Sequence, residues 1–174
     1  MKQAISPINN EIKLQEDEFI VSKTDTRGVI TYVNRTFMRV SGFSEPEMLG
    51  QPHNVIRHPE MPRGVFRLLW KTLESRQEFV GYVKNLCKDG SYYWVLANIT
   101  LDYNSNGKLQ GYYSARRKPQ ARALKAVLPL YQEMLRIEAS YGKKDGAEKS
   151  MAYLLEHCRQ QGVPYDELVL ALDR

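Results

Sequence analysis

The chain of 174 residues lacks the features that mark several protein classes at once. Hydrophobic residues make up 43% of it, yet no apolar run approaches the length needed to cross a bilayer. The opening MKQAISPINNEIK has no apolar stretch of the kind found in signal peptides. The two cysteines, Cys87 and Cys158, are too far apart for a metal or redox spacing. We therefore expect a cytoplasmic protein with reduced cysteines and no direct membrane span.

Signals for catalysis and for nucleic-acid binding are also scarce. There is no nucleophile elbow, phosphate-binding loop or recognisable carboxylate pair, so we do not expect an enzyme. The net charge of +5 is modest. The final segment carries Asp166, Glu167 and Asp173 against one arginine, which does not suit a helix that enters the major groove. We expect no nucleic-acid partner.

Hydrophobic patterning indicates a mixed α and β chain. Alternating segments bounded by turn residues predict five strands, at 19–25, 29–34, 78–87, 91–102 and 108–117. Helical spacing predicts a short helix over 35–42, closed by Gly42, and a longer one over 64–75. This order predicts an α+β fold with an antiparallel sheet and helices over one face.

Beyond Arg117 the pattern becomes helical. We predict helices at 121–140, 147–161 and 165–173, with a kink or interruption at Pro129 and a break at the KKDG of 143–146. These boundaries suggest a polar leader or cap at 1–16, one domain at 17–118 and a C-terminal helical extension at 119–174. The apolar stripes of the extension could pack on the domain, form a homodimer or contact another protein.

The stretch QPHNVIRHPEMPRGVF, residues 51–66, holds three prolines, two histidines, two arginines and a glutamate. His53 and His58 lack the spacing of a helical zinc site, and no third ligand cluster is visible, so we expect no metal. A haem with one axial histidine stays open. Arg57 and His58 could donate to a phosphate-bearing ligand, or Arg57 could pair with Glu60 on a solvated loop.

Several motifs in this order resemble one known family. The segments VSGFSEPEMLGQPHNVIRHPEMP, KNLCKDG and YWVLAN resemble the flavin-binding PAS domains of bacterial aerotaxis receptors, from about Phe19 to Arg117. The resemblance implies a PAS fold with a five-stranded antiparallel sheet and a non-covalently held FAD. It also implies a redox or oxygen sensor that signals to a chemotaxis transducer, which a partner could recruit to the inner membrane.

The same resemblance implies a set of cofactor contacts. It carries Arg57, His58 and Glu60 into the FAD pocket, with Asn34 and Trp70 nearby. Members of the family usually have aspartate where Glu60 stands, so the carboxylate here reaches one methylene farther.

A second comparison, with the light-sensing LOV branch of the superfamily, places His53 at the position of the photoreactive cysteine. We therefore expect no light-driven adduct. It also places Asn85 where LOV domains contact the pyrimidine edge of the flavin, and Val95 where a second asparagine would stand. Independently, Asn85 alternates onto an otherwise apolar strand face, so it needs either a ligand or a backbone partner.

Three functional alternatives remain at this level: the FAD sensor, a cofactor-free dimerisation or docking module, and a haem-binding gas sensor. The basic stretch ARRKPQARALK, residues 115–125, reads as a solvated linker into the extension, or as a contact for an acidic partner or a membrane face.

Overall fold

The computed structural model describes residues 5–174, so the first four residues of the expected leader lie outside the described part of the chain. The chain forms two compact units, which are described separately. The first unit holds the chain up to His58 together with Val83–Lys118. The second unit holds Pro59–Tyr82 together with Pro119–Arg174.

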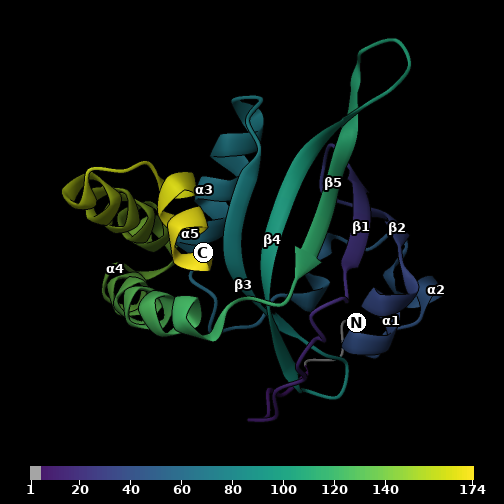
Figure 1. Ribbon diagram of the computed structural model, residues 1–174, viewed down its shortest axis with the longest axis horizontal. Helices are drawn as coiled ribbons and strands as arrows, with labels where there is room; N and C mark the ends of the chain where they lie inside the picture. The colour runs from purple at the N-terminus through teal and green to yellow at the C-terminus, as the bar shows by residue number, and fades with distance from the viewer. Residues whose placement is uncertain (1–4) are drawn as a thin grey trace. The chain divides into compact units, whose positions relative to one another are not determined.

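A five-stranded sheet carries the first unit, with the strand order β2-β1-β5-β4-β3 (Figure 1). The strands pair antiparallel wherever their register is defined, which confirms the predicted fold class. Their bounds are β1 (Ile20–Asp25), β2 (Ile30–Val33), β3 (Phe79–Leu86), β4 (Tyr92–Tyr103) and β5 (Leu109–Arg117). The first four residues of β3 are counted with the second unit.

The sheet register determines which side chains share a face. Arg116 of β5 lies opposite Ile20 of β1 and Ala97 of β4. Since side chains alternate along a strand, Ser22 and Tyr93 point to the same side as these three. All five are buried, so this face of the sheet lines the interior of the unit.

Short helices complete the first unit: α1 (Arg35–Ser41), α2 (Glu45–Met48) and the 3-10 helix η1 (His53–Ile56). Asn34 caps α1, because its Oδ1 accepts from the backbone N–H of Phe37 at 3.0 Å. Gly42 ends α1 at φ 75°, a left-handed conformation that glycine adopts without strain. The predicted helix over 35–42 is therefore confirmed within one residue.

The second unit is helical, with α3 (Arg63–Glu74), α4 (Ala121–Gln161) and α5 (Tyr165–Asp173). The chain turns inside α4 at Gly142, whose φ of 73° and ψ of −166° are not helical. Two sequence predictions are wrong here. Pro129 does not interrupt the helix, and residues 143–146 continue it. The break lies at the glycine because only that residue adopts the left-handed conformation cheaply.

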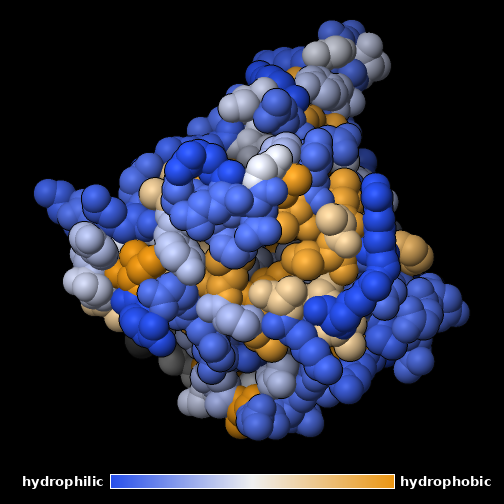
Figure 2. All heavy atoms as spheres, turned by 60° about the vertical axis from the view of Figure 1, so that its left-hand side comes forward, coloured by the Kyte–Doolittle hydropathy of each residue, from blue (hydrophilic) through white to orange (hydrophobic). Residues whose placement is uncertain are grey.

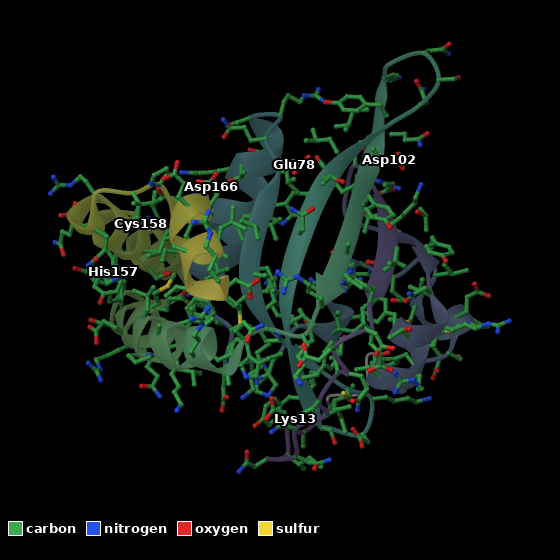
Figure 3. All side chains as sticks on the ribbon, viewed as in Figure 1. Lys13, Glu78, Asp102, His157, Cys158 and Asp166 are labelled. Carbon is green, nitrogen blue, oxygen red and sulfur yellow. The ribbon has the colours of Figure 1, made fainter. Side chains whose placement is uncertain are left out.

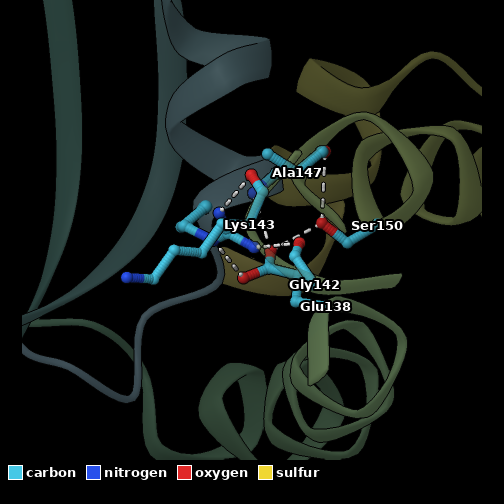
Figure 4. Close-up of polar contacts among 7 residues, drawn as sticks. Glu138, Gly142, Lys143, Ala147 and Ser150 are labelled. Atoms are coloured by element: carbon cyan, nitrogen blue, oxygen red, sulfur yellow. Dashed lines mark hydrogen bonds and ion pairs between the residues drawn. The ribbon is translucent and has the colours of Figure 1, made fainter. Parts of the chain in front are cut away.

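The start of α3 is capped from a distant part of the chain. Its N-cap position is Pro62, whose side chain cannot accept a hydrogen bond. Glu138 of α4 takes the role of the missing N-cap side chain (Figure 4). Its Oε1 accepts from the Gly64 N–H at 2.9 Å and from Ser150 Oγ at 2.6 Å. Its Oε2 accepts from Arg63 Nε at 3.2 Å. A buried carboxylate thus satisfies the open donors at a helix N-terminus, where negative charge is favourable.

Close backbone approach supports the same contact. A Cβ added to Gly64 would lie 2.1 Å from Ser150 Oγ and 2.6 Å from the backbone nitrogen of Met151. Arg63 also donates to the carbonyl oxygens of Gly142 at 3.0 Å and Lys143 at 3.1 Å, beside the interruption of α4. The interruption of α4 and the start of α3 therefore stabilise each other.

On the face drawn in Figure 2, hydrophilic residues predominate and hydrophobic ones gather in a smaller area. Within residues 5–174, no helix combines the length and apolar character that crossing a membrane requires.

Candidate functional site

Arg116 is a charged side chain in the interior of the first unit, where it is only 2% exposed. Its guanidinium lies over the ring of Phe37, 4.4 Å from the centroid. Nη2 donates to Ser22 Oγ, and Nη1 lies 3.4 Å from His53 Nε2. The third nitrogen, Nε, is buried and finds no hydrogen-bond partner among the described residues.

No carboxylate within residues 5–174 forms an ion pair with Arg116. Carboxylates of this unit pair with other cations. Asp102, labelled in Figure 3, pairs with Lys23 at 3.4 Å. Other pairs of the unit include Arg27–Asp25, Arg39–Glu18, Lys88–Glu47 and Lys118–Glu16. Burial lowers the pKa of Arg116 to about 10, but the group stays charged at neutral pH.

His53 lies beside the guanidinium of Arg116. Burial, and then the charge of Arg116, lower its pKa to about 3, so the imidazole is neutral. Ser22 Oγ lies 3.1 Å from His53 Nε2 and accepts from Arg116, so its own proton points to the imidazole nitrogen. The neutral ring therefore carries its proton on Nδ1. The Phe37 ring lies beside it, with centroids 6.0 Å apart.

Arg57 and Asn85 lie next to this cluster. Their backbones form an antiparallel bridge, and the charge of Arg57 also lowers the pKa of His53. Asn85 is 4% exposed and its Nδ2 has no hydrogen-bond partner among the described residues. The hydroxyl of Tyr93, with a pKa raised by burial, is likewise buried without one, and both Asn85 and Arg116 act on that pKa.

The chemical character of the cluster follows from these groups. The cluster offers two guanidinium groups, an amide and a phenol, and most of their polar atoms are hydrogen-bond donors. The ring of Phe37 adds a flat apolar surface. Buried polar groups are normally satisfied, so Arg116 Nε, Asn85 Nδ2 and Tyr93 OH together suit a ligand that brings acceptors and negative charge. Within the described chain there is no group of three or more side chains that could hold a metal ion.

Only some of the predicted site residues make described contacts with one another. It brings His53, Arg57 and Asn85 together in the first unit. His58 is buried in the same unit, edge-on to Tyr92 at 5.9 Å. Of the remaining predicted residues, Asn34 belongs to the first unit, whereas Glu60 and Trp70 belong to the second.

Asn34 has a structural role that accounts for its whole side chain. Besides capping α1, its Oδ1 accepts from the Val21 N–H at 3.1 Å and its Nδ2 donates to the Phe19 carbonyl at 2.9 Å. Glu60 is exposed, and Trp70 is half-buried on α3 of the second unit.

Sequence reasoning missed Arg116. It belongs to the basic stretch that was expected to be a solvated linker, and for this residue that expectation is wrong, because the side chain is buried. Arg116 shares one face of β5 with Tyr112 and Ser114, and the structure shows that both of these are buried.

Comparison with known proteins places the chain in a family. The profile of the PAS fold matches residues 30–116. The chain is 41% identical to the aerotaxis receptor of Escherichia coli K12 over 121 residues, which cover 70% of this chain and 24% of the receptor. It is 33% identical to the nitrogen fixation regulatory protein of Klebsiella pneumoniae over 60% of this chain and 21% of that protein.

Among solved structures, a light-oxygen-voltage domain studied with a flavin analogue superposes with a TM-score of 0.56 at 23% identity, over 66% of this chain and 86% of that one. The likeness to that domain concerns the fold alone. The chain spans about a quarter of the length of the curated relatives it matches. The profile covers half of the chain, including the short helices and Arg116, so the chain belongs to the PAS family.

Proposed function

We propose that this chain is a PAS sensor that binds FAD and reports the redox state of that cofactor to a separate signalling protein. The observation that carries the proposal is a set of three buried polar groups that have no hydrogen-bond partner among residues 5–174: Arg116 Nε, Asn85 Nδ2 and Tyr93 OH. An isoalloxazine ring presents carbonyl and nitrogen acceptors along one edge, and FAD adds a pyrophosphate. Bound FAD would supply a group that takes up and releases electrons.

The residues of the first unit fit such a ligand. Asn85 would hold the acceptor edge of the ring, and Arg57, His58 and Arg116 would hold its negative groups. The neutral His53 fixes the hydroxyl of Ser22, which keeps Arg116 in place. A change in the charge of the ligand would alter its hydrogen bonds to these donors. The two charge states of the ligand would then stabilise two states of the protein to different degrees, as a sensor requires.

Signalling is the second part of the proposal. The names of the relatives, an aerotaxis receptor and a nitrogen fixation regulatory protein, favour an output to a regulatory partner. We assign sensing to residues 17–118 and contact with a cytoplasmic chemotaxis transducer, or with a second copy of the chain, to residues 119–174. Leu155 of α4 and Leu170 of α5 leave apolar surface exposed in this extension.

The visible absorption spectrum of freshly purified protein, followed by acid release and identification of the chromophore, tests the proposal. Flavin bands with released FAD would support it. A protein that stays colourless after incubation with FAD would contradict it and favour a docking module, whereas a Soret band would favour haem.

A matched pair of variants makes the test specific. Asn85→Ala is expected to lower the FAD content strongly, because it removes the buried amide. Asn98→Ala, on the exposed side of β4, is the control and should retain wild-type FAD content. Equal FAD content in the two variants would mean that Asn85 does not contact the cofactor.

A further inference from the structure

Arg116 holds a buried positive charge that no carboxylate among residues 5–174 balances. The groups that face the guanidinium are His53 from η1, Ser22 from β1, Phe37 from α1 and Tyr93 from β4. None of them carries a negative charge, since burial keeps the Tyr93 phenol protonated at neutral pH.

Burying a charge without a counter-charge is expensive, so proteins rarely keep one without a use. Arg57 adds a second positive charge near the same imidazole and lowers the pKa of that imidazole further. Aromatic and hydroxyl contacts orient Arg116 but do not neutralise it. The missing partner is therefore expected to be an anion that enters with the ligand.

Resting on the FAD proposal, we infer that Arg116 makes the site prefer the reduced, negatively charged form of the cofactor, and so sets the redox level to which the sensor responds. Two electrons and one proton convert the neutral oxidised ring into a reduced ring with one negative charge, and a second proton would neutralise it. The electrons come from an external donor, for which dithionite stands in the experiment. The guanidinium keeps its own proton throughout and favours the negative ring over the neutral ones.

Two variants at Arg116 and one matched control test this inference. Arg116→Gln removes the charge and keeps a donor for Ser22. Arg116→Lys keeps the charge. Arg117→Gln is the control, because the next residue of β5 points to the opposite face and is half-exposed. The full chain is reconstituted with FAD and titrated with dithionite against a reference dye.

Arg116→Gln should weaken binding of the reduced form relative to the oxidised form by at least about tenfold, which lowers a two-electron potential by ~30 mV. For Arg116→Lys and Arg117→Gln, binding of the reduced form relative to the oxidised form should stay within about threefold of wild type. The potential of these two variants should therefore shift by less than half as much as that of Arg116→Gln. A Gln variant with the potential of the control, or a Lys variant with the shift of Gln, would overturn the inference and leave FAD binding intact. A wild-type chain that takes up no FAD overturns both proposals.

A second measurement separates this role from a structural one. If Arg116 serves the ligand, the cofactor-free Arg116→Gln protein should unfold at the same temperature as wild type or at a higher one, since an unbalanced buried charge is gone. If Arg116 holds the fold together, that apoprotein should melt earlier or fail to fold, and either result would contradict the inference.

Discussion

Replacing Glu138 with alanine tests whether a carboxylate on α4 stabilises the start of α3. The change removes the acceptor of the Gly64 N–H, of Ser150 Oγ and of Arg63 Nε. Loss of a helix cap costs about 1 kcal/mol, and a buried donor left without a partner costs about 1–3 kcal/mol. Since these contributions overlap, we expect a loss of about 2–4 kcal/mol, to which the ion pair adds little because the Arg63 side chain is 37% exposed.

Glu138→Gln should lose less, about 1–2 kcal/mol, because its amide oxygen can still accept from Gly64 and Ser150 while the charge facing Arg63 is gone. Urea unfolding followed by circular dichroism measures both changes, and hydrogen exchange should show the faster opening in α3.

The control is Glu148→Gln on the same pair of helices. Glu148 forms ion pairs with Arg67 and Lys71 of α3, but its side chain is 47% exposed. Its loss should leave the urea midpoint within error of wild type, because exposed pairs are screened. The reasoning is refuted if Glu138→Ala is as stable as this control, or if Gln and Ala at position 138 are equally destabilising.

Three further predictions concern single residues. Gly64→Ala should destabilise by about 1–3 kcal/mol in thermal unfolding although alanine favours helices, because its Cβ would meet Ser150; an increase in stability would contradict the close approach. Asn34→Ala should cost about 1–2 kcal/mol in urea unfolding through the lost cap of Phe37, and a neutral effect would argue against that capping role. The pKa of His53 is 6.5 in the unfolded chain and about 3 in the folded protein. As pH falls below 6.5, His53 therefore takes up a proton in the unfolded chain but not in the folded protein, and the free energy of unfolding decreases. Between pH 7 and 5 wild type should lose about 1–2 kcal/mol more than His53→Gln, and parallel pH profiles would exclude this linkage.

The strands could be predicted from the sequence because their signal is local. Alternating apolar residues mark β1 to β5, and Gly42 and Gly107 mark turns through their left-handed backbone. The family motifs directed attention to Arg57 and Asn85, which the structure places side by side.

The remaining features depend on partners distant in the chain. Arg116 was taken for a surface residue because charge favours exposure, and only the complete sheet reveals that its neighbours are buried. Arg63 and Glu138 are 75 positions apart, so no local pattern connects them. The turn inside α4 was misplaced because Lys-Lys-Asp-Gly resembles a loop, whereas the glycine before it, Gly142, provides the left-handed backbone.

The long-range cap of α3 has a consequence for the order in which the protein is made. Helix α3 leaves the ribosome early, whereas Glu138 and Ser150 follow only after the strands β4 and β5 have been synthesised. Until then Val65, Leu69 and Leu73, which end up buried, have no α4 to cover them. A nascent chain stalled before Glu138 would carry a helix with an open N-terminus and a bare apolar face, the kind of surface that chaperones bind. The residues of α4 therefore determine whether α3, which is synthesised before them, becomes stable.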